Sequence, residues 1–385
     1  MFAVEHDSLQ VTWPHLPRSR MTFEVAGRAF DVDATPPDWY RRSGGLRVPG
    51  GAGGPGAFTV DGLEPSTAYD VLISAPGFPK RCVDSAVTMG PPPGRLLTRF
   101  ATVSDCHFGE RVVGALHRLH DPVPMPDGLL PYPVRCACAA LEEAKTWGAS
   151  LIVAKGDLTQ DGKWEEFETA LEVFRTAGSP VAVTLGNHDV RGPVPPAETT
   201  RMFEEAGFTV ADTTRYIDVA GARLVLSHTP LPDRHAGRME PGDIDAALEA
   251  AGGTDLPAIV ILHHPLRRWP VETHYPPSLR WRDSRRLASG LRRRNPVSIV
   301  LAGHTHRNRR YSVSGVTVVE VGSTKDYPGQ WAGYSVYEGG IRQVVRRVER
   351  PDAIAWTQMT SRAIGGVWRR WSPGRMSDRC WSIDR

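Results

Sequence analysis

The chain has 385 residues, 41% hydrophobic and 23% charged, so it can bury a core and is long enough for two or three domains. It contains no run of 18 apolar residues and does not begin like a signal peptide, so we expect a soluble, cytoplasmic protein without a membrane-spanning helix. A net charge of +3 gives no reason to expect a nucleic-acid polymer as partner. Five scattered cysteines do not form a disulfide framework.

Residues 1–94 predict a small all-β sandwich domain, because short β-rich segments alternate with proline and glycine. The segment VDGLEPSTAYDVLISAPG at 60–77 resembles fibronectin type III domains. That resemblance implies that Leu63 is a core residue and Tyr69 the corner tyrosine. The sequence MGPPPG at 89–94 predicts a stiff linker. The strands are expected at 9–13, 21–25, 57–60 and 68–74.

Residues 95–350 predict an α/β domain, in which apolar strands alternate with helices such as 163–178. Ligand sites in such domains lie at the carboxyl ends of the strands. The Arg-rich segment 280–294 is interpreted as a solvated helix face, with steering of anionic substrates as the alternative. The Trp- and Arg-rich tail 351–385 has no clear periodicity and is expected to pack on the domain surface. The strands are expected at 96–103, 150–154, 181–185, 223–226, 258–262, 297–301 and 316–321.

Five polar motifs follow five of these strands. An isolated motif of this kind is usually a helix cap or a satisfied polar residue, but five in succession are not explained in that way. Their carboxylate, amide and imidazole groups are ligands that suit manganese, iron or zinc. The motifs are Asp105-Cys106-His107, Gly156-Asp157, Gly186-Asn187-His188-Asp189, His263-His264-Pro265 and Gly303-His304-Thr305-His306.

The spacing within the motifs carries a geometric expectation. Residues i and i+2 of an extended segment point to the same side, so Asp105 and His107 can share one ion. By the same rule His304 and His306 can reach one cavity. A glycine directly before a ligand lets the backbone turn tightly at the strand end.

The order D-x-H, G-D, G-N-H-D, a later His and G-H-x-H resembles the signature of the calcineurin-like metallophosphoesterase family, over about 105–306. The resemblance implies a four-layer α/β/β/α sandwich and two divalent or trivalent metal ions. It also implies that His188 is the catalytic proton donor and that Asp189 orients the ring of His188. The implied ligands are Asp105, His107 and His306 for the first ion, Asn187, His263 and His304 for the second, and Asp157 as the bridge.

Two other histidines remain as alternatives to His263. In the family the ligand stands two residues before a proline, which favours His263 over its neighbour His264. His228 stands at the same spacing before Pro230 and is the less favoured alternative.

Within the family the motifs are most similar to class III cyclic-nucleotide phosphodiesterases and their glycerophosphodiesterase relatives. This implies that metal-bound hydroxide hydrolyses a small-molecule phosphodiester and that His188 protonates the leaving oxygen. The alternatives are a broad phosphomonoesterase or phosphoprotein phosphatase, although the protein phosphatases have Glu where this chain has Asp189, and a binding module with an inactive metal domain. Gln160 stands where purple acid phosphatases have tyrosine, which disfavours a ferric–tyrosinate centre. A homo-oligomer is compatible with the sequence.

Overall fold

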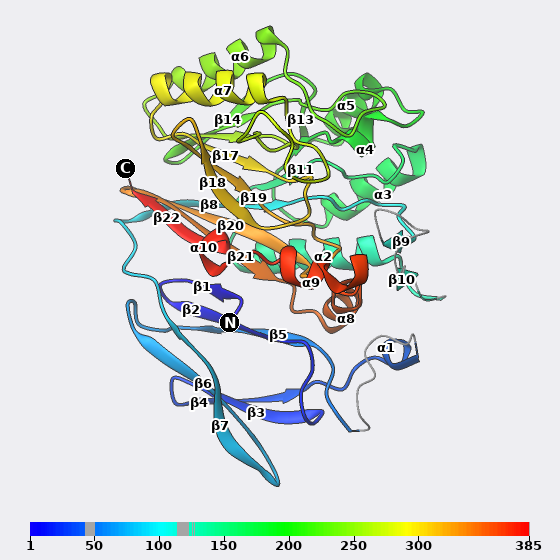
Figure 1. Ribbon diagram of the computed structural model, residues 1–385, viewed down its shortest axis with the longest axis vertical. Helices are drawn as coiled ribbons and strands as arrows, with labels where there is room; N and C mark the ends of the chain where they lie inside the picture. The colour runs from blue at the N-terminus through cyan, green and yellow to red at the C-terminus, as the bar shows by residue number, and fades with distance from the viewer. Residues whose placement is uncertain (43–50, 114–122, 125, 127, 385) are drawn as a thin grey trace.

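A computed structural model describes residues 1–42, 51–113, 123–124, 126 and 128–384. Two β-sheets lie face to face with helices on their outer sides, and the N-terminal strands lie at the other end of the long axis from α6 and α7 (Figure 1). None of the described helices is both long and apolar enough to cross a membrane.

The first sheet has seven strands in the order β13-β12-β11-β8-β20-β21-β22. Its parallel half comprises β8 (Leu96–Val103), β11 (Ile152–Lys155), β12 (Val181–Thr184) and β13 (Thr209–Ala211). Its antiparallel half comprises β20 (Gln330–Tyr337), β21 (Gly340–Arg347) and β22 (Cys380–Asp384). All residues of β11 and β12 are buried, as expected for parallel strands that are covered on both faces.

The second sheet has six strands in the order β14-β15-β16-β17-β19-β18. The four central strands are parallel, and the two edge strands run antiparallel to their neighbours. The strands are β14 (Arg215–Val219), β15 (Ala222–Leu226), β16 (Ala258–Ile261), β17 (Ile299–Ala302), β18 (Arg309–Val313) and β19 (Val316–Glu320).

Helices cover the outer face of each sheet, so the predicted α/β/β/α arrangement is confirmed. One apolar core fills the space between the sheets and includes Phe100, Leu224, Ile259 and Tyr334. A second core packs α2 (Tyr132–Thr146), α3 (Trp164–Arg175), α5 (Pro196–Glu205) and α8 (Pro351–Thr360) on the seven-stranded sheet. A third core packs α6 (Pro241–Gly252) and α7 (Trp281–Arg294) on the six-stranded sheet.

The Arg-rich end of α7 lies far along the sheet from the polar motifs. Residues 295–298 lead from α7 into the amino end of β17, whereas His304 follows the carboxyl end of that strand. This placement favours the solvated helix face over the steering of substrates.

The N-terminal part has two antiparallel sheets around a core of its own. Leu63 is buried in that core, and the hydroxyl oxygen of Tyr69 accepts a hydrogen bond from the backbone N–H of Glu64 at 3.0 Å. The resemblance to fibronectin type III domains itself stays a prediction. One sheet contains β1 (Ala3–Val4), β2 (Ser8–Trp13) and β5 (Gly56–Asp61), and the other β3 (Arg20–Val25), β4 (Arg28–Asp33), β6 (Ala68–Ala75) and β7 (Phe78–Val87). The short elements α1 (Asp38–Arg42), β9 (Val112–Val113) and β10 (Val123–Pro124) belong to neither sheet.

The tail differs from the expectation that it packs on the surface. Residues 353–360 of α8 are all buried, and β22 adds the last strand to the seven-stranded sheet. Trp356 stacks on Tyr132 of α2 with ring centroids 4.0 Å apart. Residues 351–384 are therefore part of the layered fold, and between α8 and β22 they form η1 (Ile364–Gly366), α9 (Trp368–Trp371) and α10 (Met376–Arg379).

Candidate metal centre

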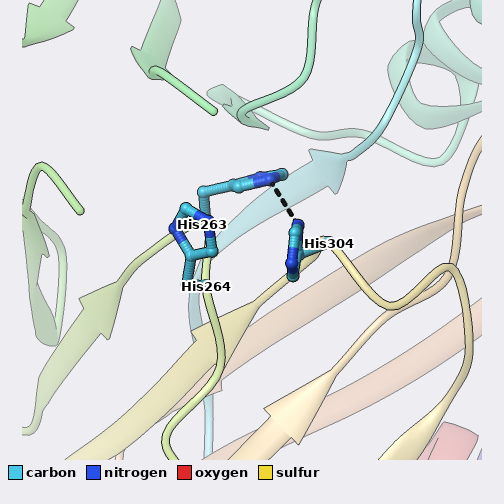
Figure 2. Close-up of side chains that lie close together, drawn as sticks. All are labelled: His263, His264 and His304. Atoms are coloured by element: carbon cyan, nitrogen blue, oxygen red, sulfur yellow. Dashed lines mark hydrogen bonds between the residues drawn. The ribbon is translucent and has the colours of Figure 1, made fainter. Parts of the chain in front are cut away.

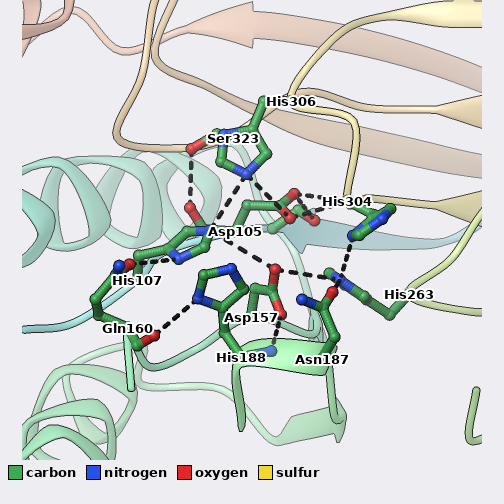
Figure 3. Close-up of polar contacts among 12 residues, drawn as sticks. Asp105, His107, Asp157, Gln160, Asn187, His188, His263, His304, His306 and Ser323 are labelled. Carbon is green, nitrogen blue, oxygen red and sulfur yellow. Dashed lines mark hydrogen bonds and ion pairs between the residues drawn. The ribbon is translucent and has the colours of Figure 1, made fainter. Parts of the chain in front are cut away.

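The five polar motifs meet at the carboxyl ends of β8, β11, β12, β16 and β17. Figure 3 shows side chains from both sheets pointing toward one another there, together with those of α4 (Asn187–Val190). The cluster brings together all seven side chains expected to be metal ligands: Asp105, His107, Asp157, Asn187, His263, His304 and His306.

The four histidines form two facing pairs. In the first pair, His107 Nε2 lies 3.2 Å from His306 Nε2. In the second pair, His263 Nε2 lies 3.1 Å from His304 Nδ1 and 3.2 Å from the side-chain oxygen of Asn187.

Two carboxylates adjoin these pairs. Asp157 lies between them, since its Oδ2 is 3.7 Å from His107 Nε2 and 3.3 Å from His263 Nε2. The Asp105 carboxylate adjoins the first pair, with Oδ1 3.5 Å from His306 Nε2. Asp157 is thus common to both pairs, and Asp105 completes a group with His107 and His306.

In each histidine the ring nitrogen that points away from the cluster meets an oxygen atom. His107 Nδ1 lies 3.0 Å from Gln160 Oε1, and His306 Nδ1 lies 2.6 Å from Asp326 Oδ2. His263 Nδ1 lies 2.8 Å from the main-chain oxygen of Lys155, and His304 Nε2 lies 3.1 Å from that of Pro277.

These four contacts decide which ring nitrogen carries the hydrogen when a ring is neutral. An oxygen acceptor holds the N–H on the outward nitrogen, so the inward nitrogen of each neutral ring presents a lone pair. Lone pairs that face each other at 3.1–3.2 Å cannot hydrogen-bond with each other, but they suit a cation between them. With metal–nitrogen bonds of about 2.0–2.1 Å, two ligands of one ion lie roughly 3.0–3.4 Å apart. The residues present therefore fit metal ions at both pairs.

Left-handed backbone conformations shape the motifs. Five of the seven side chains in the cluster belong to residues with positive φ: Asp105 (53°), His107 (48°), Asp157 (49°), His304 (70°) and His306 (51°). Such φ values are uncommon outside glycine and persist where the surrounding structure and function hold them.

The expectation of an extended i and i+2 geometry was wrong. Asp105 and His107 do adjoin the same pair, but through two left-handed residues and not through a strand. His304 and His306 both reach the one cluster, as expected, but they belong to different pairs, with His304 facing His263 and His306 facing His107.

The glycines before the ligands do two different things. Gly156 has φ +79°, so it makes the expected turn, and a Cβ there would lie 2.6 Å from His263 Nδ1. Gly303 instead permits a close approach, because a Cβ would lie 2.0 Å from the hydroxyl oxygen of Ser104. Side chains at either position would displace the cluster.

His188 stands beside the first pair, with its ring centroid 4.5 Å from that of His107. Its backbone N–H donates to Asp157 Oδ1 at 2.9 Å, and its Nδ1 lies 2.7 Å from the main-chain oxygen of Gln160. Burial lowers the pKa of His188 below its ordinary value.

The expectation that Asp189 orients the ring of His188 was wrong. The Asp189 carboxylate accepts hydrogen bonds from the backbone N–H and hydroxyl of Thr159, both at 2.8 Å, and from the backbone N–H of Gly186 at 2.8 Å. Asp189 therefore joins the loops that carry Asp157 and Asn187, and the oxygen of Gln160 holds the ring. Both oxygens of the Asp189 carboxylate bond to Thr159 or Gly186, so Asp189 positions the backbone and not the imidazole of His188.

Asp326 is a site residue that the motifs did not reveal. Its other carboxylate oxygen lies 2.8 Å from Lys325 Nζ, which is also 2.5 Å from Glu110. Tyr132 donates to the same Glu110 oxygen at 2.6 Å. Although burial opposes it, Lys325 and His306 hold the pKa of Asp326 below its ordinary value, so the carboxylate stays charged against His306.

The two alternative histidines lie behind the second pair. Ligand atoms of His263, His264 and His304 all lie within 4.8 Å of one another (Figure 2). His264 Nδ1, however, lies 2.9 Å from the hydroxyl of Thr229, and His263 is the one that contacts Asn187 and Asp157. His228 is in none of the metal-binding groups found among the described residues. The geometry favours His263.

The chain is similar to several known proteins in sequence and in fold. The chain is 25% identical over 194 residues to a Synechococcus protein named "Probable cyclic nucleotide phosphodiesterase", covering 50% of this chain and 71% of the relative. It is 28% identical over 165 residues to the 3′,5′-cyclic adenosine monophosphate phosphodiesterase CpdA of Pseudomonas aeruginosa, covering 41% of this chain and 54% of the relative. A dimetal phosphatase from Danio rerio superposes with a TM-score of 0.52 at 14% identity, over 66% of this chain and 98% of the other, which shows a shared fold.

The sequence model of the calcineurin-like phosphoesterases matches residues 98–308, which is more than half of the chain and contains all five motifs. Members of this family use a dinuclear metal centre and act on small phosphate esters. The chain belongs to the calcineurin-like phosphoesterase family and is a metal-dependent phosphoric ester hydrolase.

Proposed function

We propose that this chain hydrolyses phosphodiesters of the cyclic-nucleotide or glycerophosphodiester type with two metal ions. The observation that carries the proposal is the pair of facing imidazole pairs, each with its outward nitrogens held by oxygen atoms and with Asp157 between them. The names of the two relatives support a phosphodiester over a monoester. The division into domains at 1–94, 95–350 and 351–385, the cytoplasmic location and a homo-oligomeric state remain proposals.

Each residue of the cluster has a place in this scheme. When bound, two cations would polarise the phosphoryl oxygens and lower the pKa of a water molecule between them. Asp157 would contact both ions, because its Oδ2 lies within hydrogen-bonding or ion-pair distance of a histidine nitrogen in each pair, 3.7 Å from His107 Nε2 and 3.3 Å from His263 Nε2. Asp105, His107 and His306 would hold the first ion, and Asn187, His263 and His304 the second.

His188 would transfer the proton to the leaving oxygen. Its Nδ1–H donates to the main-chain oxygen of Gln160, so Nε2 is the atom that carries the transferred proton. The hydrogen bond from its backbone to Asp157 fixes the start of α4 beside the cluster. The ring is therefore positioned without contributing to the facing pairs.

The test measures metal content and hydrolysis in the same preparation. Protein loaded with Mn²⁺ is assayed with bis-p-nitrophenyl phosphate, p-nitrophenyl phosphate, cyclic AMP and a phosphopeptide. The proposal expects two ions per chain and turnover of the diesters above that of the monoester and the phosphopeptide. Faster hydrolysis of the phosphopeptide would favour a protein phosphatase. Two bound ions with no hydrolysis of any compound would favour a binding module.

A further inference from the structure

The tail places an aromatic ring beside the metal cluster. The ring centroid of Trp368, in α9, lies 6.3 Å from that of His306, with the ring planes 68° apart. The side chain of His306 is 17% exposed, whereas that of Asp105 is fully buried, so solvent reaches the cluster past His306. Trp368 therefore lies beside the least buried of the seven ligands.

Two sets of contacts hold this part of the tail in place. Before α9, the stacking of Trp356 on Tyr132 and a 2.6 Å hydrogen bond from the Tyr327 backbone to the hydroxyl of Thr360 fix α8. After α9, the backbone N–H of Asn308 donates to the oxygen of Ser372 at 2.9 Å, two residues from His306. The side chain of Asn308 donates to the oxygen of Pro373 at 3.1 Å. Trp368 is thus tied to the loop that carries His306.

The neighbouring Trp371 differs from Trp368. The guanidinium of Arg307 lies over the Trp371 ring, 4.9 Å from its centroid, and Arg307 in turn bonds with the buried Glu320 at 3.2 Å. Trp371 therefore has a structural partner away from the cluster. Trp368 is half-buried and meets His306 edge to face, so the two tryptophans of one short helix provide a matched comparison.

We propose that Trp368 is a specificity residue that stacks on a planar group of the substrate, such as the nucleobase of a cyclic nucleotide. The inference rests on the proposed function, which places the phosphate at the cluster beside His306. A base attached through a sugar extends away from the phosphate and can reach the exposed edge of His306, where Trp368 lies. Aromatic side chains bind bases by stacking, whereas a glycerol substituent has no planar face to offer. The chain should therefore favour nucleotide diesters over glycerophosphodiesters.

The experiment compares substrates that differ only by the base. Wild type, Trp368→Ala, Trp368→Phe and the control Trp371→Ala are assayed with 3′,5′-cyclic AMP and with ribose 3′,5′-cyclic phosphate. Loss of one stacked base should raise KM of Trp368→Ala for cyclic AMP about 5- to 150-fold. Its KM for the ribose compound, its kcat and its metal content should change less than about twofold. Trp368→Phe should recover most of the loss, and Trp371→Ala should resemble the wild type.

The outcomes separate this inference from the proposed function. An equal rise in KM for both substrates, or loss of metal from Trp368→Ala, would overturn the inference, because Trp368 would then only support His306. A wild type that hydrolyses neither of these compounds, and neither bis-p-nitrophenyl phosphate nor a glycerophosphodiester, would contradict the proposed function instead. In that case, calorimetric measurement of the binding of AMP and of ribose 5-phosphate still tests whether Trp368 stacks on the base. Weaker binding of AMP alone in Trp368→Ala supports stacking, and equal changes for both ligands exclude it.

Discussion

The two histidine pairs differ in what holds them. The outward nitrogens of the first pair meet side chains, the amide oxygen of Gln160 and the carboxylate of Asp326. Those of the second pair meet main-chain oxygens, of Lys155 and Pro277. Outer partners of this kind orient the ligand and adjust its basicity.

The difference indicates that the two ions would respond differently to mutation. A main-chain carbonyl is neutral, and it remains when the side chain of the same residue is replaced. Single substitutions of the outer partners should therefore have little effect on the second pair. The first pair has a charged partner, and Asp326 continues through Lys325 to Glu110. Single substitutions of the outer partners should therefore change the affinity of the first ion and leave the affinity of the second ion nearly unchanged.

Removal of the shared ligand Asp157 should weaken the binding of both ions, and so should not distinguish the first ion from the second. Asp157→Asn replaces the carboxylate that adjoins both pairs, so we expect both ions to be lost together and hydrolysis to fall at least about 10³-fold. Metal analysis and turnover in Mn²⁺ measure this, with Asp245→Asn as control because that exposed carboxylate pairs with Arg286 on the helix layer. Two ions retained in Asp157→Asn would show that Asp157 is not the bridge.

His188 should affect turnover without affecting either pair of ligands. In His188→Ala both ions should be retained, while hydrolysis of diesters with poor leaving groups falls about 10²–10⁴-fold. Substrates that release p-nitrophenolate need little protonation and should lose much less. Parental rates with alkyl leaving groups would exclude His188 as the proton donor.

Asp326→Asn tests directly whether the affinity of the first ion depends on the charged partner of His306. An amide at position 326 leaves Lys325 paired with Glu110 and removes the negative charge that faces His306. The electron donation to His306 then falls, so one of the two ions should bind about 10- to 100-fold more weakly. Titration of the apoprotein with Mn²⁺ should then resolve two affinities, of which the tighter equals that of the wild type. Equal weakening of both ions would contradict the difference between the pairs.

The motifs identified the seven ligands, and their resemblance to the family implied the division into two groups, whereas the residue spacing alone did not predict that division. Uninterrupted apolar strands such as β16 and β17, each followed by polar residues, indicated the carboxyl edge where the seven side chains meet. The assignment of His304 and His306 to different pairs depends on their φ values of 70° and 51°. Residue types do not specify left-handed φ outside glycine, so the extended geometry was the wrong expectation.

The outer partners and the tail show two further limits. Any residue supplies a main-chain oxygen, so nothing in the sequence marks Lys155 or Pro277 as partners of histidine. Asp326 follows strand β19 at a distance and stands four residues after Gly322, so it lacks the glycine directly before it that marks Asp157, Asn187 and His304, and it matches no family pattern. The buried part of α8 has no exposed face, because it packs against α2 and β5, and so it lacks the periodicity that reveals a surface helix.

The smallest effect is expected for substitutions of Gln160, the outer partner of His107. They show whether an outer partner acts through its charge or only by holding the ring in position. Gln160 offers His107 a neutral, half-buried oxygen that water can replace, so Gln160→Ala should weaken the first ion less than about tenfold, below the effect of Asp326→Asn. Its main-chain oxygen remains, so His188 keeps its partner and the rate per bound ion should stay unchanged. Gln160→Glu should instead tighten the first ion, because it gives His107 the same kind of charged acceptor that His306 has in Asp326. Mn²⁺ titration could instead show that Gln160→Ala and Gln160→Glu change the affinity for the first ion in the same direction. The outer partner would then act only by holding the ring in position, and the charge of Asp326 would not explain why the first ion responds to mutation.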